Sequence, residues 1–308
     1  MNTRIFLTGA SGYLGSLLME RLAELPEVES ITGIALSTPR GKLPPKVKFL
    51  QMDMRSPNLT AIMAGHDVVV HTACIVLWPA RMSVQERDDI NFNGVRNVAR
   101  AAMANKITRF IHTSSMAAYD PEWARGKSDV TEDSPIGRGD SAFYYWNAKA
   151  GAEKALREMF NSSSTMLTFL RPIYIIGPRN RSNARSYREN AINFPGQNPR
   201  RQFIHEEDVV AAFIHALHTD LPGAFNVAPD DFLRMRDVWK IVGAKFIPTV
   251  PLGLASWITG IRWRFLGSPI HPSWVRDMLV DFTGSNAKLK DTGWRPRFNS
   301  EQALRSAL

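Results

Sequence analysis

Apolar runs of β-type residues alternate with longer amphipathic stretches along the first half of the chain. The runs are interpreted as buried parallel strands and cover residues 5–7, 31–35, 47–50, 67–71, 109–113 and 166–170. Helices are predicted between most of them, most clearly at residues 12–24, 83–105 and 142–160. This alternation predicts an α/β fold built on a doubly wound parallel sheet.

The pattern changes after Arg171-Pro172. Residues 177–201 are dense in proline, glycine and arginine and predict a loop-rich segment of the kind that holds a substrate. Residues 206–218 then predict a helix, and residues 224–227 predict a strand that returns to the sheet. We expect a main domain from residues 1–171 and about 202–228, and a smaller C-terminal substrate-binding region from residues 172–201 and 229–308.

Composition and charge narrow the classes of function. The 308 residues are enough for a large core, and the net charge of +9 would attract anionic ligands. No Lys/Arg block, zinc-finger spacing or aromatic-basic RNA motif is present, so a nucleic-acid partner is not expected. The single cysteine, Cys74, excludes an internal disulfide and is expected to serve packing. With no signal-peptide core near Met1, these features predict a cytoplasmic protein.

The stretch 246–261 is apolar, but Pro248 and Pro251 interrupt it and Arg262-Trp263-Arg264 follows it. It is too short and too broken to span a membrane. Its aromatic and basic edge leaves an interfacial amphipathic helix open as an alternative. We favour a core or pocket-lining helix here, and membrane contact is not expected.

A glycine-rich turn follows the first expected strand, with the sequence Thr8-Gly9-Ala10-Ser11-Gly12-Tyr13-Leu14-Gly15. Such glycines permit a tight turn and a close approach of the backbone to a pyrophosphate, and the helix that follows offers free N–H groups. The spacing differs by one residue from the usual dinucleotide pattern. A purely structural turn is the alternative, and the strand–turn–helix context favours the cofactor.

The end of the second expected strand is the place where an acid would recognise NAD, and it holds Ala35-Leu36-Ser37-Thr38-Pro39-Arg40. No carboxylate stands in that segment. Ser37, Thr38 and Arg40 suit a ribose 2′-phosphate, so the cofactor is predicted to be NAD or NADP, with NADP preferred. A solvated loop arginine is the alternative for Arg40.

Tyr145 and Lys149 stand four residues apart in a predicted helix and therefore share one of its faces. A nearby ammonium favours phenolate, so Lys149 is expected to lower the pKa of Tyr145 from its ordinary value of about 10. Tyr145 would then act as a general acid or base. By itself this spacing also arises by chance on many helices.

Several motifs in one order resemble the extended short-chain dehydrogenase/reductase family, also called the NAD-dependent epimerase/dehydratase family. They include the glycine turn, Asp53 at the expected adenine position, His71-Thr72-Ala73, Thr113-Ser114-Ser115 and the Tyr145–Lys149 pair. The segments 170–178 and 201–209 also match. The resemblance implies a Rossmann-type fold in which the catalytic residues are Asn91, Ser115, Tyr145 and Lys149.

The resemblance also assigns the binding residues. Cofactor contacts are expected from Gly9, Ser11, Gly12, Tyr13, Leu14, Gly15, Ser37, Arg40, Asp53, Met54, Thr72, Ala73, Asn91, Thr113, Tyr145, Lys149, Pro172 and Ile175. Substrate contacts are expected from Trp78, Ser115, Met116, Tyr145, Tyr174 and Arg201. No spacing of His, Cys or acidic residues suits a metal.

The implied reaction is reversible hydride transfer between a nicotinamide and a carbonyl or alcohol carbon. Met116-Ala117 follows Ser115 where dehydratases of the family place an acidic pair, so dehydration is disfavoured. Aromatic residues of the cap, at positions 257, 263, 265 and 274, favour a small or lipophilic substrate.

Two other functions are weighed against this interpretation. Arg201 and its neighbouring arginines leave a nucleotide-sugar epimerase with tightly bound NAD as an alternative. A non-catalytic NAD(P)-sensing protein would have been expected to lose Ser115, Tyr145 or Lys149. The helices at 83–105 and 142–160 resemble those that pair in family homodimers.

Overall fold

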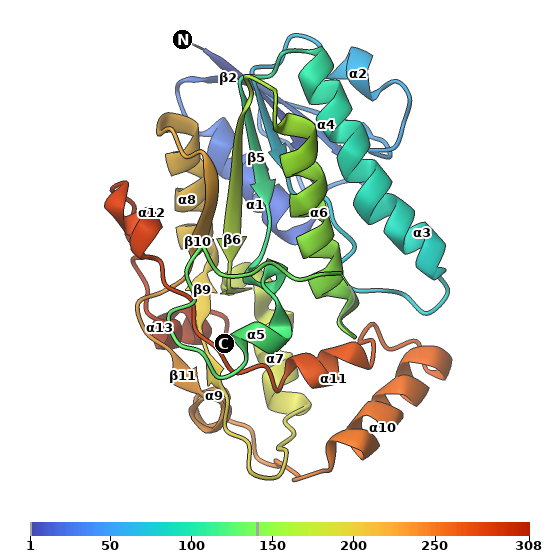
Figure 1. Cartoon of the computed structure of the whole chain (residues 1–308), viewed down its shortest axis with the longest axis vertical. Helices are drawn as coiled ribbons and strands as arrows, with labels where there is room; N and C mark the ends of the chain where they lie inside the picture. The colour runs from blue at the N-terminus through green and yellow to red at the C-terminus, as the bar shows by residue number, and fades with distance from the viewer. Residues whose placement is uncertain (1, 140–141) are drawn as a thin grey trace.

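The computed structural model describes residues 2–139 and 142–308, and its centre is a parallel β-sheet (Figure 1). Within these residues the sheet has seven strands in the order β10-β6-β5-β4-β1-β2-β3. Their bounds are β1 Thr3–Thr8, β2 Val28–Ala35, β3 Val47–Gln51, β4 Val68–His71, β5 Arg109–Thr113, β6 Met166–Pro172 and β10 Gly223–Val227. Every neighbouring pair is parallel. The predicted doubly wound α/β fold is confirmed.

Strand β1 pairs with β2 on one side and with β4 on the other. The chain therefore moves outward along the sheet through β3 and then returns to the centre at β4. At such a reversal the connections leave the sheet on opposite faces, which opens a crevice at the carboxyl ends of the strands. This topology places the glycine turn after β1 beside the segments that follow β4 and β5.

Helices cover both faces of the sheet. Helices α1 (Tyr13–Ala23) and α8 (Glu206–His218) pack on one face, while α4 (Gly94–Ala104) and α6 (Tyr144–Phe160) pack on the other. Side chains alternate along a strand, so Ile5 and Leu7 of β1 join the first core and Phe6 joins the second. All of these core side chains are fully buried.

The helix expected at 83–105 is continuous but not uniform. It consists of α3 (Val84–Asp88), a π-helical turn at Asp89–Asn93 and then α4. A π-turn inserts one extra residue into the helix and is frequently found at functional sites. Here the insertion carries Asn91, which is buried.

Two small sheets and several helices form the rest of the chain. Strand β7 (Tyr174–Ile176) pairs in parallel with β9 (Phe203–His205), and β8 (Arg200–Arg201) pairs antiparallel with β11 (Leu233–Arg234). The segment expected to be loop-rich also contains helix α7 (Arg181–Glu189). The remaining helices are α2 Leu59–Ile62, α5 Pro121–Ala124, α9 Met235–Val242, α10 Leu252–Phe265, α11 Ser273–Asp277, α12 Ala287–Asp291 and α13 Ser300–Ser306.

Helix α10 differs from the expectation of a core or pocket-lining helix. Ala255 is the only one of its residues that is buried, and Figure 1 shows α10 at the lower right, projecting beside α11. The apolar stretch was a correct signal for a helix, but hydrophobicity alone does not say whether another element covers it. Across the described residues, no helix combines the length and apolar character needed to cross a membrane.

Candidate active site

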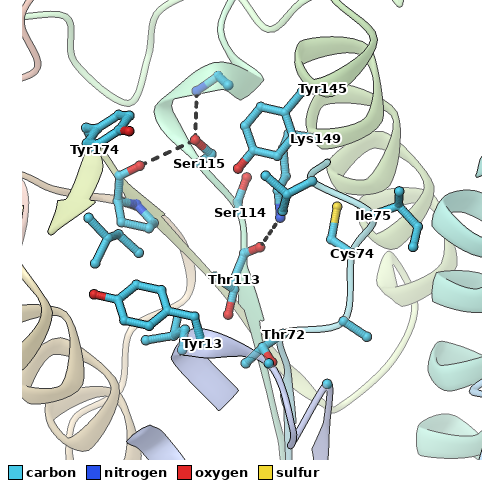
Figure 2. Close-up of a pocket in the computed structure, with 18 of the residues that line it drawn as sticks. Tyr13, Thr72, Cys74, Ile75, Thr113, Ser114, Ser115, Tyr145, Lys149 and Tyr174 are labelled. Carbon is cyan, nitrogen blue, oxygen red and sulfur yellow. Dashed lines mark hydrogen bonds between the residues drawn. The ribbon is translucent and has the colours of Figure 1, made fainter. Parts of the chain in front are cut away.

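A cavity of about 560 Å³ lies at the carboxyl ends of the central strands. One end is bounded by the glycine turn and the ends of β2 and β3, and the other by β7, α7 and α11. The predicted cofactor residues all line this cavity except Arg40 and Asn91. Figure 2 shows residues from the glycine turn, β5, α6 and β7 directed into the same space.

The glycine turn is tightly packed. Gly9 has a φ of +72°, which L side chains rarely adopt, and a Cβ on Gly15 would lie 2.1 Å from the carbonyl oxygen of Gly9. Helix α1 begins directly after Gly12, and no side chain caps it. The first N–H groups of α1 are therefore free of side-chain partners at the cavity wall. Backbone of this kind fits the pyrophosphate of a dinucleotide.

The cavity wall beyond β2 and β3 is formed by Ser37, Asp53 and Met54, among others. Arg55 binds the Asp53 carboxylate, with Nη2 2.6 Å from Oδ2, and this hydrogen bond lowers the pKa of Asp53. The Ser37 hydroxyl lies 3.0 Å from that of Ser11. These groups can form hydrogen bonds to an adenosine.

Arg40 was predicted to contact the same part of the cofactor, but it is exposed and lies outside the cavity wall. It follows β2 by five residues, in a segment without helix or strand. Among the described residues no hydrogen bond or ion pair joins Arg40 to the cavity wall. Closeness to the end of β2 in the sequence therefore does not place its side chain in the cavity.

Tyr145 and Lys149 project from the first turns of α6 into the cavity (Figure 2). The Lys149 ammonium donates a hydrogen bond to the carbonyl oxygen of Thr113 at the end of β5, over 2.8 Å. Burial works to lower the pKa of Lys149, but Cys74, Tyr145 and Glu153 outweigh it, so the pKa is raised. Lys149 therefore stays charged close to the tyrosine.

The pKa of Tyr145 is raised, which corrects the expectation that Lys149 would lower it overall. Burial is the largest influence and favours the neutral phenol, whereas Lys149 acts in the expected direction but is weaker. The sequence shows the spacing of the two residues and not how far the phenol is removed from water. Burial thus keeps the phenol of Tyr145 in its neutral form.

Ser115 lies next to the Tyr145 hydroxyl, at the point where the chain leaves β5 (Figure 2). Its hydroxyl accepts a hydrogen bond from the Ala117 amide over 3.1 Å and donates one to the Pro172 carbonyl over 3.4 Å. Two backbone groups thus hold the serine oxygen beside the phenol. A substrate oxygen between them could receive hydrogen bonds from both.

Asn91 does not line the cavity. Its side-chain oxygen accepts a hydrogen bond from the Ile75 amide over 2.8 Å, so it holds the segment after β4, which does line the cavity. Its Nδ2 atom is buried and has no hydrogen-bond partner among the described residues. Asn91 therefore contacts the segment that lines the cavity and not the cavity itself.

The other end of the cavity is mostly aromatic and apolar. The Trp274 ring lies beside that of Tyr145, with the ring centroids 5.5 Å apart and the planes tilted by 31°. Tyr174 and Met116, both predicted substrate contacts, line this end. Sequence reasoning missed several further lining residues. Trp146 lies inside the Tyr145–Lys149 motif, but the spacing does not show that its side chain lines the cavity. The others come from segments with no motif: Asn183, Tyr187, Asp277, Met278, Val280 and Phe282.

Asp277 is the one carboxylate at this end among the described lining residues. Trp146 donates its indole N–H to Oδ1 over 2.6 Å, and burial raises the pKa of the acid. The acid therefore faces the cavity while one of its oxygens is held by the helix that carries Tyr145.

Arg201 also lines the cavity, but its guanidinium already forms hydrogen bonds with backbone carbonyl groups. It donates to the carbonyl oxygens of Arg200 and Val280, each over 2.8 Å, and to that of Met278. The neighbouring arginines are paired as well, in Arg179–Glu20, Arg185–Glu189 and Arg200–Asp281. Arg179 thus binds α1 of the main domain, Arg185 is paired within α7, and Arg200 binds the segment after α11.

Trp78 was predicted to contact substrate, but it lies outside the cavity wall. It packs against Tyr144, Trp263 and His271, and Arg87 lies over its ring at 4.2 Å. These contacts fill the space between the main domain and α10. Of the cap aromatics expected to form a pocket, Trp274 lines the cavity, whereas Trp257 and Phe265 are exposed.

Comparison with known proteins agrees with the fold and with the order of the motifs. The model of the NAD dependent epimerase/dehydratase family matches residues 5–228. The chain is 22% identical over 340 residues to 3-beta-hydroxysteroid dehydrogenase of Mycolicibacterium neoaurum, covering 99% of this chain and 90% of that one.

Two epimerases are similar as well. N-acetyl-alpha-D-glucosaminyl-diphospho-ditrans,octacis-undecaprenol 4-epimerase of Escherichia coli O157:H7 is 29% identical over 194 residues, which are 59% of this chain and 52% of that protein. The structure of UDP-glucuronic acid 4-epimerase from Bacillus cereus in complex with NAD superimposes with a TM-score of 0.75 at 19% identity, covering 99% and 97% of the two chains. With its fold, its ordered motifs and the family match over most of its length, this chain belongs to the NAD-dependent epimerase/dehydratase family of extended short-chain dehydrogenase/reductase enzymes.

Proposed function

We propose that this enzyme transfers hydride between a nicotinamide dinucleotide and a carbonyl or alcohol carbon of a lipophilic substrate. The observation that carries the proposal is the composition of the cavity next to Tyr145. That end is lined by Trp146, Trp274, Val280 and Phe282, while the guanidinium of Arg201 already donates to three carbonyls. An apolar molecule gains from this lining, and a diphosphate would have to compete for the arginine.

The residues present fit the cofactor. The amides at the start of α1 would hold its pyrophosphate, and Lys149 would hold the nicotinamide ribose. When bound, the nicotinamide supplies or accepts the hydride. The protein then has to orient the substrate, exclude water and move one proton.

Tyr145 would carry that proton. In reduction the neutral phenol gives its proton to the substrate oxygen, and in oxidation the phenolate takes it back. Ser115 would donate a hydrogen bond to the same oxygen and stabilise its developing charge. Lys149 would lower the free energy needed to form the phenolate, because its ammonium lies near the ring.

The cofactor is proposed to be NADP in preference to NAD. The described cavity wall at the end of β2 is Ala35, Leu36 and Ser37, and none of these repels a 2′-phosphate. The position of Arg40 outside the cavity weakens the original reason for this preference. What supports the preference now is the absence of an acid among these three residues.

A nucleotide-sugar epimerase with tightly bound NAD is the second candidate. Two observations favour it: Arg201 lies at the cavity wall, and epimerases are among the similar proteins. The similarity to a steroid dehydrogenase over nearly the whole chain favours the first candidate. The two differ in whether cofactor is consumed.

The proposal can be tested by assaying the purified protein with lipophilic ketones and alcohols and, separately, with UDP-sugars. Lipophilic ketones and alcohols, including 3-hydroxysteroids, are expected to change the absorbance of added NAD(P)(H) at 340 nm. Tyr145→Phe is the matched control and should remove that change. Release of NAD from the purified protein, together with interconversion of UDP-sugars without net absorbance change, would contradict the proposal and support the epimerase.

The enzyme is also proposed to form a homodimer through the α3–α4 and α6 helices. A shallow groove on these helices is lined by Val84, Phe92, Arg96 and Ala155, among others. Light scattering after gel filtration should give twice the mass of 34.6 kDa. We place the enzyme in the cytoplasm, because its one cysteine forms no disulfide.

A further inference from the structure

Helix α10 presents its large apolar side chains outward. The side facing the protein carries mainly small residues, of which Ala255 is buried and Gly260 lies against Pro272. The opposite side carries a stripe at spacings of three, one, three and four residues: Leu254, Trp257, Ile258, Ile261 and Phe265. An ordinary surface helix has the reverse arrangement, with polar residues facing water.

The exposure of this stripe is large for such side chains. Trp257 is 65% exposed and Phe265 is 72% exposed. Leu266, which directly follows the helix, is 72% exposed, and Phe246, in the loop between α9 and α10, is 79% exposed. A contiguous apolar surface on a protein of this kind marks a site of interaction.

The charged residues of the segment that contains α10 all have the same sign. From residue 245 to residue 276 the chain contains no aspartate or glutamate, but it contains Lys245, Arg262, Arg264 and Arg276. Within residues 2–139 and 142–308, none of these four cations forms a salt bridge. A partner surface that fits α10 is therefore apolar where it meets the stripe and anionic where it meets the basic residues.

We propose that α10 docks on an anionic lipid bilayer, with its outward stripe in the interface and its arginines at the headgroups. Trp and Phe beside Arg and Lys are the residues that interfacial helices use. The helix lies along the surface and does not cross it. This inference replaces the expectation that membrane contact is absent.

A second copy of the chain is a poorer occupant. In a two-fold contact the same surface patch lies on both sides, and residues 245–276 contain no acidic residue, so the arginines of one α10 would find no counter-charge in this segment of the partner. A bilayer with anionic headgroups offers the opposite charge and attracts each basic residue near its surface. Charge therefore favours the bilayer.

The inward side of α10 contacts a segment that lines the cavity. Trp263 of α10 donates its indole N–H to the Trp78 carbonyl over 2.7 Å, in the segment where Val76 is both exposed and part of the cavity wall. After α10 the chain leads into α11, where Trp274 lines the cavity. A docked α10 would thus hold the cavity close to the bilayer, where lipophilic molecules are concentrated. The docking itself is independent of the proposed reaction.

Vesicle sedimentation tests the docking without any activity assay. The full chain is mixed with vesicles of phosphatidylcholine alone or with 30% phosphatidylglycerol, at low ionic strength. We expect binding to the anionic vesicles and much less to the neutral ones. Trp257→Ser with Phe265→Ser should lower the partition coefficient at least about tenfold, because two large apolar side chains no longer enter the interface.

Matched variants separate the two parts of the surface. Arg264→Glu should weaken binding to anionic vesicles, whereas Lys240→Glu on α9 makes the same change in net charge and should leave it unchanged. Phe232→Ser removes an exposed apolar side chain elsewhere and should also have no effect. Circular dichroism confirms that each variant is folded.

Three outcomes would overturn the docking. They are no binding to either vesicle, equal loss of binding in Lys240→Glu and Arg264→Glu, and unchanged binding in the variant that lacks Trp257 and Phe265. Self-association in sedimentation velocity that this variant abolishes, without vesicle binding, would instead assign the patch to a second copy of the chain.

Discussion

Arg171 on β6 and Glu153 on α6 form an ion pair that is fully buried. The guanidinium meets the carboxylate with both Nε and Nη2, at 2.8 and 2.7 Å, and Ser114 donates its hydroxyl to the same carboxylate. Glu153 lies one helical turn after Lys149. The pair therefore fastens the helix that carries Tyr145 and Lys149 to the sheet beneath the site.

Glu153→Gln is expected to destabilise the protein by about 3–5 kcal/mol, because it leaves the Arg171 charge buried without a counter-charge. The change is measured as the free energy of unfolding in urea. Arg157→Ala is the control, since Arg157 is a half-exposed partner of the same carboxylate and should cost less than about 1 kcal/mol. The double variant Glu153→Gln with Arg171→Met should lose less than the sum of the single changes; additive losses would show that the two residues do not act as a pair.

Tyr145→Phe should lower kcat at least about 100-fold and leave the dissociation constant of the cofactor unchanged, because only the proton donor is removed. Both values come from steady-state kinetics and fluorescence titration. Normal turnover in this variant would refute the role given to Tyr145.

Lys149→Met should move the pH dependence of alcohol oxidation. Because the pKa of Tyr145 is raised by burial, oxidation is expected to become faster as the pH rises and more phenolate forms. Lys149 opposes that effect, so its removal should shift the alkaline rise in kcat to still higher pH. A shift to lower pH would contradict the electrostatic role of Lys149.

His71 and His112 stack in the core below the site, with ring centroids 5.2 Å apart. Burial lowers the pKa of His71 to about 3 and that of His112 well below its ordinary value. Below pH 6.5 the unfolded chain takes up protons that the folded chain does not, so stability falls as the pH falls. For His71 alone this amounts to about 2 kcal/mol between pH 7 and pH 5.

His112→Leu should therefore flatten the loss of stability between pH 7 and pH 5. Both ring nitrogens of His112 are buried and have no hydrogen-bond partner in the described chain, so leucine removes no bond. Urea unfolding at several pH values measures the slope. His218→Gln changes an exposed histidine and serves as the control; an unchanged slope in His112→Leu would exclude the core histidine as its source.

Ser37→Asp should shift the cofactor preference from NADP towards NAD by at least about tenfold in the ratio of kcat/KM. A carboxylate at the end of β2 can accept a hydrogen bond from the ribose 2′-hydroxyl and repels a 2′-phosphate. Ser37→Asn has a similar size without the charge and separates the two effects. An equal shift of the cofactor preference in both variants would mean that the size of the side chain, and not its charge, causes the change.

The fold followed from the sequence because its signals are local. The strands of the main sheet, the helices α1, α6 and α8 and the continuous α3–α4 helix agree with the predicted segments to within a few residues, since each apolar run and each amphipathic stretch carries its own period. The short strands and helices of the remaining segments, such as α7, were not predicted. The π-turn around Asn91 was not predicted, because an extra residue in a helix leaves no change in hydrophobic period that is visible over one turn.

The sequence by itself determined the chemical core of the site. The glycine turn, Ser115, Tyr145 and Lys149 lie at strand ends or on one helix face, where spacing along the chain fixes their relative positions. Only the tertiary structure decided the rest: the raised pKa of Tyr145, the arrival of Asp277 and Trp274 at the cavity, and the outward face of α10. Burial, charge pairing and exposure depend on which distant segments pack together, and no local pattern records that.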